Sequence, residues 1–198
     1  RKGWGNRKED VRGWLGAVCS APLPSLGVPL KGLDGHLSEM EFWFPTEELD
    51  TAAVDDLCRR HLLPGLPRPP LPPRTLTGLL MGFADLVFVH GNRHGVLDYK
   101  SNTLGIEDAD YTPQAMARAM LDNRYDVQAA IYGVALHRLL RRRLGMRYQP
   151  EEHLHGAIYF FLRGVAAPGA GAFHLHLPAQ LLDGLDALLP NLDGVPAT

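Results

Sequence analysis

The sequence predicts an α/β domain in which a mixed β-sheet is flanked by helices. Two apolar, β-branched runs surround a turn at residues 90–95 and indicate an antiparallel hairpin. A nearly all-apolar run at 156–162 is typical of a strand that is covered on both faces. Apolar residues at helical spacing occur before, between and after these runs, so helices and strands are expected to share one core.

Composition places the chain among ordinary globular proteins. Its 198 residues suffice for one sizeable core. The net charge is −2, so an anionic partner must be held by a local patch or by a metal ion. Cys19 and Cys58 are too few for a disulfide framework or a zinc site, which fits the reducing cytoplasm. No apolar run is long enough to cross a membrane.

The first part of the chain is expected to form a helix, a strand and a second helix. Helical spacing predicts a short helix at 10–19 with Trp14 in the core. Residues 37–45 alternate as a strand that its last residue, a proline, would end. A charged surface helix is expected at 46–63, and six prolines make 64–73 a stiff connecting loop.

The second part continues with the hairpin, an acidic loop and a helical segment. The hydroxyl of Thr112 and the ring of Pro113 mark a helix start. After a break at 122–123, a longer helix follows until Gly145 stops it. The expected elements are strands at 75–89, 96–101, 156–162 and 173–177 and helices at 113–121, 124–144 and 181–189.

Both strands of the hairpin carry an acid. Asp98 and Lys100 lie two residues apart, so they face the same way, and Asp85 on the other strand can come close to Asp98. Two carboxylates and an ammonium on one sheet face are costly unless a cation or a substrate neutralises the acids. Mg²⁺ prefers one or two carboxylates together with waters and phosphate oxygens. The lysine would then hold a water or steady a developing negative charge.

Other polar residues share a face of their own element. Glu39 and Glu41 do so on the strand at 37–45, where a solvated face is the simpler interpretation and the residues alone do not choose between the two acids. Gln128 and Tyr132 lie four apart on the long helix. The C-terminal end of the long helix is basic, which suits the helix dipole, so a solvated end is the simpler interpretation. Contact with phosphate is the sharper alternative. The arginines of this helix end are Arg138, Arg141, Arg142, Arg143 and Arg147.

Four motifs in this order resemble the RecB-type branch of the PD-(D/E)XK nuclease superfamily. They are the family's early glutamate strand at 38–42, its first aspartate strand at 82–88, its catalytic strand at 97–102 and its QxxxY motif at 125–132. The stretches 135–138 and 159–165 look like the nuclease domains of RecB subunits in particular. The resemblance covers roughly residues 17–165 and the tail more loosely.

The resemblance implies a restriction-endonuclease-like fold with a metal site. Asp85 and Asp98 would hold Mg²⁺, and the main-chain carbonyl of Tyr99 would complete the coordination. Mn²⁺ is the expected substitute, and Ca²⁺ is expected to bind.

The resemblance also implies roles for the remaining matched residues. Lys100 would orient or activate the attacking water, and Glu39, not Glu41, would assist the metal or the water. Gln128 and Tyr132 would position the catalytic strand or the DNA strand.

The implied function is that of an Mg²⁺-dependent exodeoxyribonuclease domain of a RecBCD-type helicase-nuclease in the bacterial cytoplasm. It would hydrolyse phosphodiester bonds during double-strand break repair and DNA degradation. The implied partners are single-stranded DNA or unwound duplex and RecC-like and RecD-like subunits, with the recombinase RecA as a further candidate. The alternative is a docking module for RecA or for partner subunits with little activity as an isolated fragment.

Two family features fall outside the sequence. The family's histidine metal ligand lies on a helix well upstream of the glutamate strand, and His36 is not at its position. The helicase phosphate loop, G-x-x-x-x-G-K-S/T, is also missing. Residues 1–198 are therefore expected to be a single nuclease domain from a longer protein, without that helix and the helicase region. Such a fragment is expected to bind metal weakly and to be weakly active.

Overall fold

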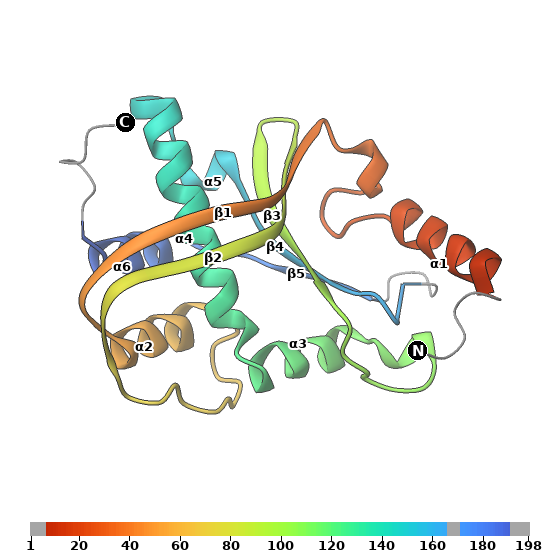
Figure 1. Ribbon diagram of the computed structural model, residues 1–198, viewed down its shortest axis with the longest axis horizontal. Coiled ribbons are helices and arrows are strands. Elements are labelled where there is room, and N and C mark those ends of the chain that lie inside the picture. The colour runs from red at the N-terminus through yellow and green to blue at the C-terminus, as the bar shows by residue number, and fades with distance from the viewer. Residues whose placement is uncertain (1–6, 166–170, 191–198) are drawn as a thin grey trace.

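The computed structural model describes residues 7–165 and 171–190, which are built around one five-stranded sheet (Figure 1). The strand order follows the sequence, and only β3 and β4 pair in parallel. The mixed sheet that the sequence predicts is therefore confirmed. The strands are β1 (Gly35–Asp50), β2 (Thr75–His90), β3 (Arg93–Lys100), β4 (Leu154–Phe161) and β5 (Ala172–Leu175).

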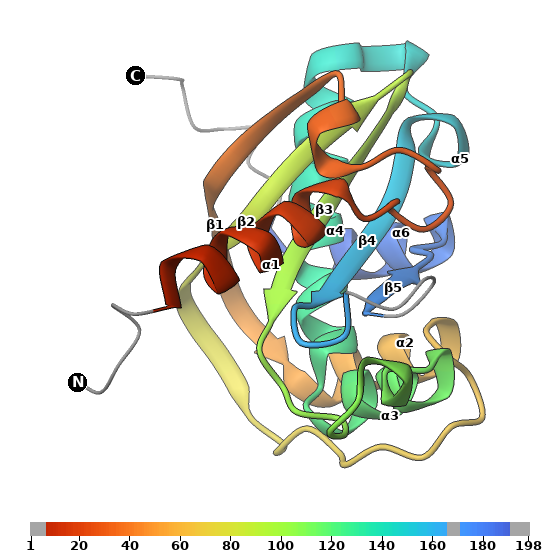
Figure 2. The same cartoon turned by 90° about the vertical axis from the view of Figure 1, so that its right-hand side faces the viewer.

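Helices cover both faces of the sheet (Figure 2). The helix α1 (Lys8–Ser20) lies against one face, and α2 (Thr51–His61), α4 (Tyr125–Leu144) and α6 (Ala179–Ala187) lie against the other. The remaining helices are α3 (Pro113–Asp122), the short α5 (Pro150–His153) and the 3-10 turns η2 (Leu30–Gly32), η3 (Asp108–Asp110) and η4 (Gly145–Arg147). No helix in the described residues is long and apolar enough to cross a membrane.

The hairpin of β2 and β3 is tighter than the sequence suggests. His90 pairs with Arg93, so only Gly91 and Asn92 form the turn. Gly91 has a φ of 58°, a left-handed conformation that two-residue hairpin turns require and that glycine adopts without strain. This register continues to Leu86 opposite Leu97 and thereby fixes which side chains meet further along the strands.

The first strand is longer than predicted, because Pro45 does not end it. β1 is an edge strand, where the missing N–H of a proline leaves no ladder bond unmade. It continues past a register shift between Thr46 and Leu49 and stops at Asp50. The carboxylate of Asp50 accepts from the amide of Ala52 at 2.8 Å and caps α2, so the helix begins five residues later than the predicted 46.

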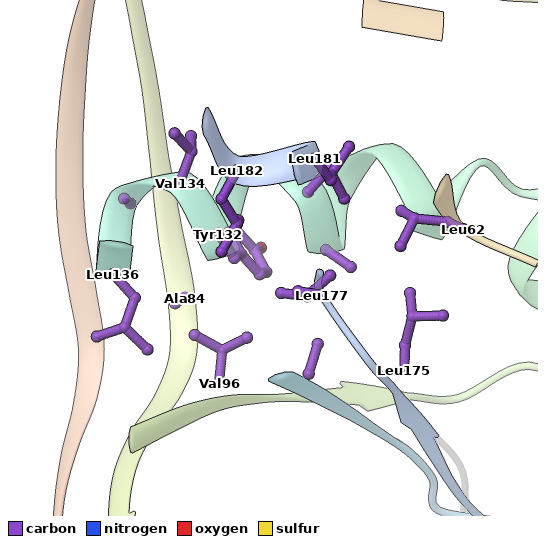
Figure 3. Packing of buried hydrophobic residues seen from close by; sticks show 14 of the residues in the cluster. Leu62, Ala84, Val96, Tyr132, Val134, Leu136, Leu175, Leu177, Leu181 and Leu182 are labelled. Atoms are coloured by element: carbon purple, nitrogen blue, oxygen red, sulfur yellow. The ribbon is translucent and has the colours of Figure 1, made fainter. Parts of the chain in front are cut away.

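Two unequal cores lie on the two sides of the sheet. The larger one packs α2, α4 and α6 onto the strands, and Figure 3 shows Tyr132 of α4 beside Leu182 of α6, on the side that faces Val96 of β3. The smaller one holds α1 and the following loop against Leu97 and the outer residues of β4. All residues of β4 are buried, as predicted for a strand covered on both faces.

One expectation about the core is wrong. Trp14 is not a core residue: 39% of it is exposed, and its indole N–H donates to the carbonyl of Leu162 at 3.0 Å. Arg138 and Arg141, which the alternative assigned to phosphate contact, both pair with Asp186 of α6. These two arginines therefore join α4 to α6, which favours a structural use of the basic helix end.

Candidate functional site

The acids of the first three strands lie in one row across the sheet. Beyond Leu86, β2 leaves β3 and continues with β1 alone (Figure 1), and Asp85 is the first residue past this split. The hairpin pairing ends at Leu86 opposite Leu97, one residue before Asp85 and Asp98, and the charge of Asp85 acts on Asp98. At the split, the carboxylate of Asp85 accepts from the amide of Tyr99 at 2.9 Å, where a main-chain carbonyl would otherwise serve. Asp85 is thus fixed beside the end of β3.

Glu39 lies next in this row. Ser38 pairs with Leu86 and Met40 with Ala84, so Glu39 sits beside Asp85. It is exposed and has a φ of 52°. A left-handed residue other than glycine costs about 1–3 kcal/mol, and such strain gathers at functional sites. The row therefore ends in a strained, accessible carboxylate.

Asp98 and Lys100 form a buried ion pair on the α4 side of β3. Asp98 is 4% exposed and Lys100 9%. The ammonium lies 2.5 Å from Oδ2 of Asp98 and donates to Oε1 of Gln128 at 2.8 Å. It also lies 3.8 Å from the ring centroid of Tyr125. An acid, an amide and an aromatic ring therefore fix the lysine from three sides.

The helix α4 supplies the other half of the site. Nε2 of Gln128 donates to the hydroxyl of Tyr132 at 2.8 Å, and that hydroxyl donates to Oδ1 of Asp98 at 3.4 Å. The hydroxyl of Tyr159 donates to Oε1 of Gln128 at 3.3 Å. The amide of Gln128 is thus oriented by partners on both of its ends. The spacing of four between Gln128 and Tyr132 brings both side chains onto β3, as the sequence suggests.

The electrostatics of the site disfavour the charge on Asp98. Burial raises the pKa of its carboxyl, and the nearby Asp85 adds to the rise although Lys100 opposes it. Burial and the charge of Asp98 raise the pKa of Tyr132 to about 12, so its hydroxyl stays protonated and donates. A carboxylate whose charge is unfavourable in the folded protein is a ligand that a cation would stabilise.

The predicted metal ligands can be compared with the geometry. In residues 7–165 and 171–190, no three His, Cys, Asp or Glu side chains converge into a metal-binding group. The predicted set needs only the carboxylates of Asp85 and Asp98 and the carbonyl of Tyr99. Asp85 lies against the amide of Tyr99 and its charge acts on Asp98, so both acids lie near the end of β3, and hard oxygen donors suit Mg²⁺. Oδ2 of Asp98 is buried with the ammonium of Lys100 as its close contact. The donor set fits the ion, and its role stays a prediction.

The sequence analysis missed two aromatic residues of the site. Tyr125 and Tyr159 stack at 5.9 Å and enclose the ammonium of Lys100. Tyr125 lies three residues before Gln128 on the same helix face, which is a signal that the sequence offered. The position of Tyr159 depends on the parallel pairing of β3 and β4, which opposes it to Asp98.

A second buried charge cluster borders the site. Asp126, one residue from Tyr125, accepts from Arg68 at 2.8 Å and from Arg124 at 3.0 Å. Arg124 also donates to Asp55 of α2 at 2.6 Å. Arg68 reaches in from the proline-rich loop and donates to the carbonyls of Leu62 and Leu63. We call Asp55, Arg68, Arg124 and Asp126 the loop clamp, because they tie this loop and α2 to the start of α4.

Known proteins relate the chain to one subunit of a bacterial enzyme. The "RecBCD enzyme subunit RecB" of Escherichia coli is 46% identical over 184 residues, which are 90% of this chain and 16% of RecB. This chain is a relative of RecB. The RecB of Haemophilus influenzae is 33% identical over 185 residues, which are 91% of the chain and 15% of that protein. The RecB of Mycolicibacterium smegmatis is 34% identical over 196 residues, with 84% and 18% covered.

These relationships confirm the RecB resemblance that the motifs suggested. The chain spans less than a fifth of the length of these RecB relatives, so the relationship concerns one part of RecB. No family model matches the chain. Membership of the PD-(D/E)XK superfamily and the roles of the site residues remain predictions.

Proposed function

We propose that this chain is a metal-dependent deoxyribonuclease domain of the PD-(D/E)XK type that works within a RecBCD-type enzyme. The supporting observation is the Asp98–Lys100 pair, which is buried, is held by Gln128 and lies close enough to Asp85 to sense its charge. A buried acid with a raised pKa beside a lysine and a second acid is typical of a catalytic site rather than of a packing contact. The relationship to RecB supports the same assignment.

In this proposal, each residue has a defined task. Asp85, Asp98 and the carbonyl of Tyr99 would hold Mg²⁺, with Mn²⁺ as a substitute. When bound, the ion would supply a Lewis acid for the scissile phosphate and lower the pKa of a water. Lys100 would hold the water that adds to phosphorus while one P–O bond breaks and the leaving oxygen takes up a proton. Gln128 would keep the lysine in place.

Glu39 and Tyr132 would support these groups. Glu39 is accessible at the end of the acid row and would assist the metal or the water. Tyr132 joins Gln128 to Asp98 and would preserve the distance between α4 and β3. The same proposal includes exonucleolytic action in double-strand break repair. It also includes RecC-like and RecD-like subunits and RecA as partners.

The proposal is tested by cleavage of end-labelled single-stranded DNA by the complete protein. We expect cleavage in Mg²⁺ and none in chelator. Lys100→Ala should lower cleavage by at least about 100-fold, since losing a residue that only orients a metal ligand already costs about 10–100-fold. Cleavage that persists in chelator, or that is unchanged in Lys100→Ala, would exclude the assignment.

We propose as a second function that the chain docks a partner subunit, because it exposes an unusual apolar surface. Trp43, Leu79, Met81 and Phe83 are each about half exposed. Trp43 pairs with Met81, and the core residues Phe42 and Phe44 point the other way, so the four lie on the outer face of β1 and β2. We call them the outer stripe. Exposed apolar clusters on this scale mark interaction sites.

The charges around the outer stripe indicate its partner. The strands β1 and β2 contain no lysine or arginine. Exposed acids on β1 surround the stripe: Glu39, Glu41, Glu47 and Glu48. An apolar protein surface with a basic rim would fit, such as that of a RecC-like or RecD-like subunit. Met81→Glu should reduce co-purification with these subunits, and Leu66→Glu, on the exposed proline-rich loop, should not. Equal co-purification of both variants would exclude docking at this face.

A further inference from the structure

A cavity of about 470 Å³ opens beyond the ends of β3 and β4. Ser101 follows β3, and Leu162 and Arg163 follow β4, so the parallel pair of strands ends at this point. The helix α1, which lies in front of the sheet in Figure 2, supplies the opposite wall with Trp14 and its neighbours. In α/β sheets, the crevice outside the carboxyl ends of parallel strands is the usual place for a ligand.

Trp14 is presented in this cavity as a fixed aromatic surface. Its indole N–H donates to the carbonyl of Leu162 at 3.0 Å, which limits the rotation of the ring. Nevertheless 39% of the residue remains exposed. A large ring held in place and still accessible is suited to stacking, because little conformational freedom is lost when a ligand binds.

The cavity also offers positive charge. Nε of Arg163 donates to the carbonyl of Ser101 at 2.9 Å, and a guanidinium carries further N–H groups that match phosphate oxygens. Arg7 lines the other side and is exposed. One acid, Asp10, lies in the same lining, so two cations face one anion. In a chain whose net charge is −2, this is a local patch that can hold an anion.

The position of the cavity relates it to the candidate active site. Ser101 directly follows Lys100, and consecutive Cα atoms are about 3.8 Å apart. The Asp98–Lys100 pair itself is buried on the α4 side of β3, so the cavity lies past the end of the same strand on the α1 side of the sheet. The three contributing segments come from separate parts of the sequence, and the hydrogen bonds of Trp14 and Arg163 join them.

We propose that this cavity binds one nucleotide of the single DNA strand that is being cut, past the end of the strand that carries the Asp98–Lys100 pair. Its base stacks on Trp14, and its phosphate contacts Arg163 and Arg7. Aromatic stacking beside cationic side chains is the general mode by which proteins hold single strands. The inference rests on the proposed function for the reaction at the neighbouring site, whereas binding of the strand can be measured separately.

The first experiment measures the affinity of the complete protein for single-stranded oligonucleotides of mixed sequence in chelator, where cleavage is excluded. Trp14→Ala should weaken binding about 5- to 150-fold, the range found for single stacked bases. The matched control is Leu15→Ala, since Leu15 is the next residue on α1, is 47% exposed and does not line the cavity. Equal affinities of the two variants would overturn the proposal.

A second variant, on the opposite wall of the cavity, tests the proposal in case the Trp14→Ala protein does not fold. Arg163 is exposed, and its replacement leaves both cores intact. Arg163→Ala should weaken binding and reduce the slope of log affinity against log salt by about 1, and Arg163→Lys should restore the slope. An unchanged affinity and slope in Arg163→Ala would overturn the proposal.

Oligonucleotides with one abasic position then locate the stacked base. The unaltered protein should lose affinity when the abasic position reaches the cavity, and Trp14→Ala should not respond to it. A Trp14→Ala protein with the same response overturns the subsite. The two proposals can fail independently. If the protein binds DNA through Trp14 but does not cleave it in Mg²⁺, the nuclease function is wrong. If it cleaves DNA normally and Trp14→Ala binds DNA as tightly as the unaltered protein, the nucleotide subsite is wrong.

Discussion

Two buried charge clusters meet at the start of α4 and differ in how their acids are satisfied. In the loop clamp, Asp126 and Asp55 each accept from two arginines. In the candidate site, Asp98 has one ammonium as its cation and receives a long hydrogen bond from a phenol. Burial opposes both charges, but hydrogen bonds from Arg59 and Arg124 lower the pKa of Asp55, whereas the pKa of Asp98 is raised.

This difference separates a structural from a functional use of buried charge. A carboxylate surrounded by guanidinium groups gains from ionisation and holds parts of the chain together. A carboxylate left with too few partners is held in an unfavourable state that a cation or substrate can relieve. The loop clamp and the candidate site share α4, since Asp126 and Gln128 lie two residues apart. The clamp can therefore position the helix on which the site depends.

The largest effect should come from breaking the loop clamp. Asp126→Ala leaves Arg68 and Arg124 buried without their shared carboxylate and should lower the free energy of unfolding by about 3–5 kcal/mol. Chemical denaturation measures this loss. The control is Asp122→Ala, which removes an exposed pair with Arg118 and should cost no more than about 1 kcal/mol. Similar losses in both variants would show that the clamp is not structural.

The opposite pattern is expected at Asp98. Asp98→Ala should reduce Mg²⁺-dependent cleavage by at least about 100-fold, because the proposed metal site would lose one of its two carboxylates. Its free energy of unfolding should fall by less than that of Asp126→Ala, because an unfavourable buried carboxylate is removed and the single ammonium left behind keeps its contacts with Gln128 and the ring of Tyr125. Cleavage assays and denaturation on the same preparation measure both. A stability loss as large as that of Asp126→Ala would erase the distinction between the clusters.

The residues of the candidate site could be predicted from the sequence, whereas those of the loop clamp could not. The acids of the hairpin and the Gln128–Tyr132 spacing are local patterns, so periods of two and four residues suffice to bring them together. The loop clamp joins Arg68 to Asp126 across 58 residues, and no short-range period reports such a contact. The end of β1 was missed for a related reason: Pro45 stops an inner strand but not an edge strand, and the strand order is a tertiary property.

The smallest expected effect is a pH dependence of opposite sign in the two clusters. The folded-state pKa of Asp98 lies above its ordinary value of 3.8, so its ionisation destabilises the metal-free fold at neutral pH. This penalty disappears as the pH falls through the raised pKa towards 3.8. The folded-state pKa of Asp55 lies below 3.8, so its stabilisation is complete above that value and is lost only at lower pH.

Denaturation in chelator between pH 7 and pH 3 separates these two contributions. The quantity compared is the free energy of unfolding of Asp98→Ala minus that of the unaltered protein. This difference should decrease as the pH is lowered from neutral to about 3.8, because the unaltered protein recovers stability when Asp98 is protonated. The deficit of Asp55→Ala should stay constant over that range and shrink only below about 3.8. Parallel curves for the two variants would mean that both acids are equally satisfied, and the contrast between structural and functional charge at the start of α4 would fail.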